Sequence, residues 1–159
     1  MLPIKKLPVP QVLLDYHSET IAKNEMPTYN GFTAYKLEKD DDGTRIPKNE
    51  APFYKLREQL LQEQKSVCAY CGQTIANVEN EYGKAQMKTE HFNPQNGKTE
   101  NDLNYQNLLA CCLGNSDKKG ENHCDSMKSN GEMISIQNPS TLEFRDNEII
   151  YYVENASEE

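Results

Sequence analysis

The sequence predicts one small α+β fold with a thin hydrophobic core. Apolar spacing typical of a helix follows Asn49, and two short apolar runs between residues 87 and 110 are typical of strands. A chain of 159 residues has room for one ordinary core and an arm, but only 36% of its residues are apolar and it has no tryptophan. Such a core gains much from a structural metal ion, so we expect one.

The N-terminal region, residues 1–48, is predicted to be an arm followed by one short helix. Three prolines interrupt the first ten residues, and the apolar patch Val12-Leu13-Leu14 follows them. We expect the helix to run from about residue 11 to residue 24. The arm has no apolar stretch of signal-peptide length and nothing else in the chain approaches a membrane span. We therefore expect a cytoplasmic protein without a membrane partner.

A second helix is predicted to open the central unit, residues 49–135. Asn49 is a suitable N-cap, and Pro52 falls in the first turn, where its missing N–H does no harm. Phe53, Leu56 and Leu60 recur at helical spacing, which predicts the buried face of this helix. The unit then continues as a strand at 87–92, a long loop, a strand at 106–110 and one or two helical turns within 123–130.

The C-terminal region, residues 136–159, is predicted to be a β-hairpin with an acidic tail. Its strands are expected at 141–145 and 148–153, and residues 143–159 hold six acidic residues and one arginine. The whole chain has a formal net charge of −8. This balance argues against a protein that binds nucleic acid unaided, because affinity for phosphates depends on Lys and Arg.

The five cysteines indicate a metal site, since paired thiols in a chain without an export signal are typical of metal ligands. Cys68 and Cys71, separated by two residues, can grip one tetrahedral ion from a tight turn, and Gly72 lets the chain reverse after them. The second pair is expected from Cys124 together with either Cys111 or Cys112.

The choice between Cys111 and Cys112 depends on side-chain direction, because alternate residues of a strand face opposite sides. We choose Cys112 as the ligand and expect Cys111 to be a buried apolar thiol. His123 is a rival ligand, because sites with three cysteines and one histidine are common.

The pair Glu90-His91 is the candidate catalytic site. Adjacent strand residues point to opposite faces, so the two side chains can serve one site only where the strand ends, and Pro94 indicates such an end. A carboxylate there can hold a divalent cation while the histidine faces an attacking water.

These motifs together resemble the HNH, or ββα-metal, nuclease family. The matching residues are Cys68-x-x-Cys71, Glu90-His91-x-x-Pro94, Asn107-Leu108-Leu109 and Cys124-Asp125-x-x-Lys128, and the resemblance covers 68–130. More narrowly, the Cys-Ala-Tyr-Cys opening and the Glu-His-Phe-x-Pro pair look like the PtuB-type nuclease subunits of Septu antiphage systems, some of which are associated with retrons.

The resemblance implies a small zinc-stabilised ββα-metal (HNH) nuclease core and a role for each matching residue. Zn²⁺ would be structural on Cys68, Cys71, Cys112 and Cys124. His91 would be the general base, with Asn107 orienting its ring through a hydrogen bond. Glu90 and Asp125 would hold a catalytic Mg²⁺ or Mn²⁺, and Lys128 would face a substrate phosphate. The family more often has Asp at the position of Glu90, and Asn or His at the position of Asp125.

The resemblance also implies partners. We expect a nucleic acid substrate, DNA before RNA, and a PtuA-type ATPase subunit, with a retron reverse transcriptase and its RNA–DNA product as further candidates. The N-terminal arm is predicted to dock on the ATPase through apolar side chains, namely Leu2, Ile4, Leu7, Val9 and the Val12-Leu13-Leu14 patch. Alternatives are an arm packed on its own domain, an RNA substrate such as tRNA, and a non-catalytic zinc-ribbon interaction module.

Overall fold

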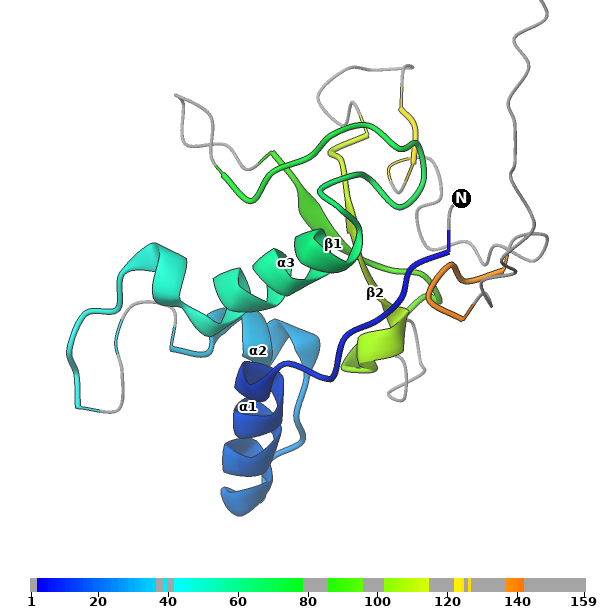
Figure 1. The fold of residues 1–159 in the computed structure, drawn as a ribbon. Coiled ribbons are helices and arrows are strands. Elements are labelled where there is room, and N and C mark those ends of the chain that lie inside the picture. The colour runs from blue at the N-terminus through cyan, green and yellow to red at the C-terminus, as the bar shows by residue number, and fades with distance from the viewer. Residues whose placement is uncertain are drawn as a thin grey trace, which may run out of the picture.

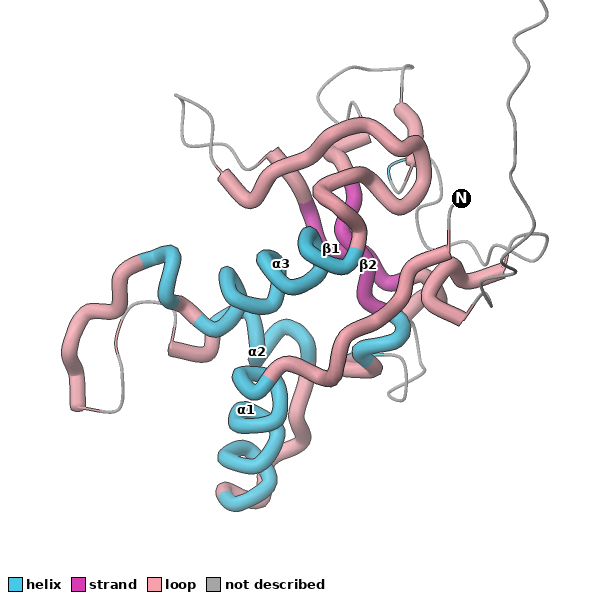
Figure 2. Tube along the Cα trace, in the orientation of Figure 1, coloured by secondary structure: helices cyan, strands magenta, loops and turns pink. Residues whose placement is uncertain are grey.

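The structure is a computed structural model and describes residues 3–36, 39, 42–78, 86–95, 102–114, 122–124, 126 and 137–141. Within these ranges it is a small α+β fold with three α-helices and one two-stranded antiparallel sheet, as predicted at this level (Figure 1). Much of the remaining described chain is loop (Figure 2). The predicted C-terminal hairpin and most of the helical segment 123–130 lie outside the described residues.

The first helix, α1, spans Gln11–Ala22 and begins at the predicted residue. It ends two residues earlier than expected, because Asn24 adopts a left-handed conformation with φ of 57°. A second helix, α2 (Tyr29–Ala34), was not predicted. The side chain of its N-cap, Thr28, accepts a hydrogen bond from the Gly31 N–H, which stabilises this single turn and a half.

The third helix, α3, spans Pro52–Glu63, and Leu56 and Leu60 on its predicted face are fully buried. Pro52 occupies the first turn, as predicted. The prediction that Asn49 caps the helix was wrong. Asn49 belongs to the short 3-10 helix η1 (Lys48–Glu50), and the N-cap is Ala51, which makes no side-chain capping bond.

The sheet consists of β1 (Lys88–His91) and β2 (Leu108–Cys111), both within the predicted regions apart from the last residue of β2. The strands pair antiparallel, with Glu90 opposite Leu109 and His91 opposite Leu108. The 3-10 helix η2 (Tyr105–Asn107) leads directly into β2.

Helix α3 lies at the centre of the fold, in contact with α1 and α2 and with β2 (Figure 1). One buried cluster joins these elements; among its members are Leu13, Tyr16, Phe32, Leu56, Leu60, Leu108 and Ala110. A second, smaller cluster consists of Ile4, Ala69, Phe92 and Leu109. Through Ile4, the N-terminal arm takes part in the cluster that buries Leu109 of β2. Among the residues that the structure describes, no helix is both long and apolar enough to cross a membrane.

The N-terminal arm packs on its own domain. Ile4 and Leu13 are buried, and the Ile4 N–H donates to the carbonyl of Pro139. The Lys6 Nζ lies 2.8 Å from Glu63 Oε2 on α3 and donates to the Leu108 carbonyl of β2. The prediction that Ile4 and Leu13 dock on a partner was therefore wrong, because the core already uses both side chains.

Candidate functional site

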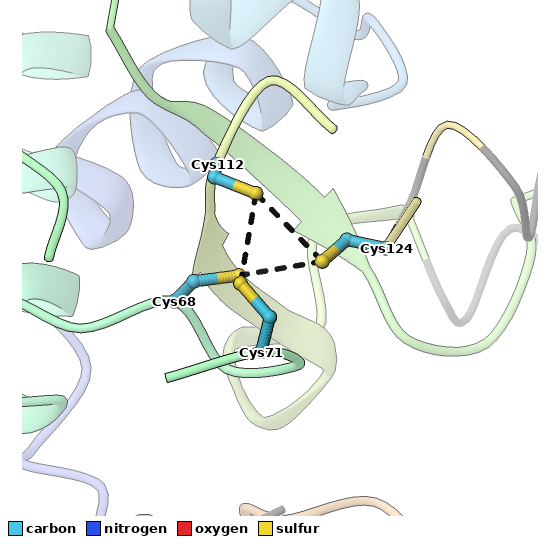
Figure 3. Close-up of side chains that lie close together, drawn as sticks. All are labelled: Cys68, Cys71, Cys112 and Cys124. Atoms are coloured by element: carbon cyan, nitrogen blue, oxygen red, sulfur yellow. Dashed lines mark hydrogen bonds between the residues drawn. The ribbon is translucent and has the colours of Figure 1, made fainter. Parts of the chain in front are cut away.

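Four cysteine thiols gather where three segments of the chain meet (Figure 3). Cys68 and Cys71 come from the loop after α3, Cys112 directly follows β2, and Cys124 comes from a later segment. All four sulfur atoms lie within 4.8 Å of one another. This is the set chosen from the sequence.

The sulfur separations fit a tetrahedral ion. They are 3.9 Å for Cys68–Cys124, 3.9 Å for Cys71–Cys112 and 3.7 Å for Cys112–Cys124. A zinc ion with Zn–S bonds of about 2.3 Å places its ligands about 3.8 Å apart, whereas a disulfide requires about 2 Å. The four thiols could therefore hold a metal ion such as zinc.

The first knuckle is shaped by backbone hydrogen bonds. The Cys68 N–H donates to the Gln73 carbonyl and the Gly72 N–H donates back to the Cys68 carbonyl, which closes a tight turn. Gly72 has φ of 73°, the left-handed conformation that its missing Cβ permits. The predicted chain reversal after Cys71 is confirmed.

The geometry places Cys112, the residue chosen from the sequence, in the thiol cluster in preference to Cys111. Cys111, the last residue of β2, is fully buried in the core, while the next residue, Cys112, turns its sulfur into the cluster. His123, the rival ligand, lies beside the cluster, with its Nδ1 3.1 Å from Cys124 Sγ and 3.8 Å from Cys112 Sγ.

The thiols differ in acidity. Burial raises the pKa of Cys112 to about 11 and also raises the pKa of Cys124. Burial acts in the same direction on Cys68, but backbone hydrogen bonds, chiefly from Cys71, outweigh it and lower the pKa of that thiol. Because a metal binds thiolates, a cation entering this cluster would release protons.

Glu90 is connected directly to the first knuckle. Its side chain is buried at 6% exposure, and the hydroxyl of Tyr70 donates to its Oε1 over 3.1 Å. Tyr70 lies between Cys68 and Cys71 in the chain, so the thiol cluster and the carboxylate share one loop. This role of Tyr70 was not predicted from the sequence, although the place of the residue between the two cysteines is a usable signal.

His91 is the last residue of β1, so the strand ends where the sequence predicted. Its Nε2 lies 2.9 Å from the main-chain carbonyl of Asp102, and the ring of Tyr29 packs edge-on against the imidazole with centroids 4.6 Å apart. Burial raises the pKa of Tyr29 to about 12, so its hydroxyl is protonated at neutral pH. Neither Asp102 nor Tyr29 was predicted, and no local pattern marks them.

Asn107 holds the chain just beyond His91. Its Oδ1 accepts from the Asn93 N–H over 2.7 Å, and its Nδ2 donates to the Asn93 carbonyl over 3.0 Å. Asn107 was predicted to hold the ring itself through a hydrogen bond. At Nε2 that role belongs to the Asp102 carbonyl, and the amide of Asn107 fixes the backbone two residues later.

Ser126 lies against the face of β1 that carries Glu90. Lys88 Nζ donates to Ser126 Oγ over 3.2 Å, and Lys88 and Glu90, two residues apart on a strand, share a face. The Ser126 hydroxyl also donates to the carbonyl of Leu113, just after β2. The predicted ligand Asp125 and the predicted phosphate contact Lys128 lie outside the described residues.

Comparison with known proteins identifies no relative: no protein-family model, curated protein or solved structure matches this chain.

Proposed function

We propose that the chain is a metal-dependent HNH-type endonuclease that hydrolyses phosphodiester bonds, with DNA as the first substrate to test. One observation supports this most. Glu90 and His91 stand at the end of β1, beside an antiparallel β2 whose far end contributes Cys112 to the four-thiol cluster. A carboxylate and an imidazole at a strand end, on a metal-stabilised frame, are the groups that such a reaction needs.

In this proposal His91 is the general base. A carbonyl oxygen only accepts hydrogen bonds, so the Asp102 carbonyl requires the hydrogen of the neutral ring to be on Nε2. Nδ1 then has the lone pair and takes a proton from the water that attacks phosphorus, while the bond from phosphorus to the leaving oxygen breaks. Asn107, by fixing the backbone of Asn93, keeps the strand end rigid.

The proposal assigns two metals. Zn²⁺ on Cys68, Cys71, Cys112 and Cys124 would be structural. A catalytic Mg²⁺ or Mn²⁺, held by Glu90 and Asp125, would supply charge stabilisation at the scissile phosphate. The oxygen donors of these two carboxylates suit such hard cations, whereas four thiolates suit zinc.

The proposal is tested by comparing His91→Ala with His17→Ala, which alters an exposed histidine on α1. With Mg²⁺ or Mn²⁺, we expect DNA cleavage to fall by about 100-fold to 10,000-fold in His91→Ala and to stay unchanged in His17→Ala. Zinc content and the circular dichroism spectrum should be the same in both. Cleavage by His91→Ala at the wild-type rate would refute the nuclease proposal.

A second candidate function is a non-catalytic zinc-ribbon interaction module. The observation that favours it is burial, since Glu90 is 6% and His91 9% exposed, as structural polar residues often are. The cleavage assay described above distinguishes the nuclease from the interaction module. A zinc-loaded wild-type protein that cleaves neither DNA nor a matched RNA, including a structured RNA such as tRNA, would support the interaction module.

We further propose that the nuclease works with an ATPase subunit, which would supply the basic surface that this acidic chain lacks for binding phosphates. The net charge of −8 leaves little attraction for phosphates, so a partner that contributes basic surface would bring substrate and nuclease together. Of the described apolar side chains predicted to dock, Leu7, Val9 and Leu14 are exposed and available to such a partner, whereas Ile4 and Leu13 are buried.

A further inference from the structure

Asp102 joins three parts of the chain through three different oxygen atoms. Its main-chain carbonyl accepts from His91 Nε2 over 2.9 Å. Its Oδ2 accepts from the backbone N–H of Tyr29 over 2.8 Å, and its Oδ1 accepts from the side-chain amide of Gln95. The carbonyl therefore touches the ring while the carboxylate holds the carbonyl in place.

A single hydrogen bond can orient the His91 ring only if its acceptor, the Asp102 carbonyl, is itself held in place. The carboxylate of Asp102 provides this restraint. Asp102 lies in the connection between β1 and β2, outside both strands. Its anchors are α2, 73 residues earlier in the sequence, and Gln95, seven residues earlier. The first anchor comes from a distant helix and the second from the same connection as Asp102, and together they restrain the position of the carbonyl.

Tyr29 makes two contacts that restrain His91, one through its backbone N–H to Asp102 and one through its ring. It is the first residue of α2, so its N–H has no acceptor within the helix and is available to the carboxylate. Its ring meets the imidazole of His91 at 87°, an edge-on packing that limits rotation of the histidine. One residue thus anchors the acceptor and confines the ring.

We infer that Asp102 is a positioning residue for His91: its carboxylate, tied to the N-terminus of α2 and to Gln95, holds the imidazole in the tautomer that makes Nδ1 the proton acceptor. This inference rests on the proposed nuclease function for its catalytic meaning. Its structural content, the tautomer, is measurable without activity.

The first test is ¹⁵N NMR of histidine-labelled protein at a pH where the rings are neutral. The chain has three histidines, and the signal absent from His91→Ala identifies His91. We expect the Nε2–H tautomer in the wild type and a mixture of tautomers in Asp102→Ala. Asp102→Asn should keep the wild-type pattern, because its amide can still accept from Tyr29 and bond to Gln95. An unchanged tautomer in a folded Asp102→Ala would overturn the inference.

A second pair of variants isolates the anchor on α2. Tyr29→Ala removes the ring and keeps the N–H, whereas Tyr29→Pro removes both. Proline is tolerated at the first helical position, and Thr28 before it is already extended, with φ −131° and ψ 155°. We expect a larger loss of the Nε2–H tautomer in Tyr29→Pro than in Tyr29→Ala. Equal spectra would show that the N–H of Tyr29 contributes nothing.

Activity gives an independent readout. In Asp102→Ala we expect kcat to fall by about tenfold to a hundredfold with KM unchanged, as for other partners that orient a functional histidine. If His91→Ala is fully active, the nuclease proposal fails while the tautomer result stands. If the tautomer is unaffected by Asp102→Ala in an enzyme that needs His91, only the positioning role fails.

Discussion

Two adjacent cysteines at the end of β2, Cys111 and Cys112, lie in different environments. The side chain of Cys111 packs in the hydrophobic core with no exposed area, while that of Cys112 lies 3.7 Å from Cys124 Sγ. The difference follows from strand alternation, which sends consecutive side chains to opposite faces. The same residue type therefore joins a cluster that could hold a metal ion at one position and packs as a small apolar group at the next.

The matched substitutions Cys112→Ala and Cys111→Ala should separate these roles. Cys112→Ala removes one of the four thiols that could hold a metal ion, so we expect zinc to transfer from this variant to a chromogenic chelator at much lower chelator concentrations than from the wild type. Cys111→Ala should retain zinc and lose about 1 to 2 kcal/mol of unfolding free energy through a small cavity. Zinc loss from Cys111→Ala as ready as from Cys112→Ala would contradict the assignment.

At the scale of elements, α3 and β2 are joined by a glutamine that substitutes for a neighbouring strand. Gln64, the C-cap of α3, donates to the Ala110 carbonyl over 2.8 Å and accepts from the Ala110 N–H over 2.7 Å. Its side chain thus covers a backbone edge that a two-stranded sheet leaves open on the side away from β1. The Ala69 N–H donates to the same carbonyl.

Gln64→Leu should destabilise the fold far more than Gln62→Leu, which alters an exposed glutamine on the same helix. Leucine at 64 leaves the buried Ala110 N–H without an acceptor, so we expect the free energy of unfolding to fall by about 1 to 3 kcal/mol. The change at 62 should stay within about 0.5 kcal/mol. Urea denaturation of both variants measures the difference, and equal midpoints would rule out the strand-like role.

At the scale of the whole molecule, a buried ion pair fixes the N-terminal arm to the core. Lys6 and Glu63 have side-chain exposures of 3% and 0%, and Lys6 Nζ lies 4.0 Å from the centroid of the Tyr105 ring. Tyr105 and the Leu7 N–H both donate to Glu63 Oε1. Burial lowers the pKa of Lys6, while the attraction of Glu63 opposes this shift. Removing the arm would leave a buried carboxylate without its cation, which is strongly destabilising.

The proposed docking on an ATPase is therefore better tested by surface substitutions than by deletion of the arm. Leu7, Val9 and Leu14 are 37%, 40% and 45% exposed, and Val78, outside the arm and α1, is a matched control at 48%. We expect the triple change Leu7→Ser, Val9→Ser and Leu14→Ser to weaken co-purification with the proposed ATPase partner about tenfold or more. Val78→Ser should not. Undiminished complex formation by a folded triple variant would exclude this surface.

The sequence by itself determined the features that depend on short spacing. Two cysteines separated by two residues, a glycine after them and strand alternation at 111–112 were sufficient to choose the four thiols that meet in space. The apolar runs located both strands, and Pro94 located the end of β1. Each of these predictions rests on local geometry, in which the position of one side chain follows from its neighbours in the chain.

Only the tertiary structure decided which groups surround His91 and where the arm lies. The carbonyl that holds the ring, the edge-on Tyr29 and the Lys6 contact with β2 involve partners 11, 62 and 102 residues away in the sequence, as their numbers show. Such contacts form because α3 packs against α1, α2 and β2, and this packing buries polar groups that must then find partners. No local pattern records which partner a buried polar group will meet, since packing alone selects it.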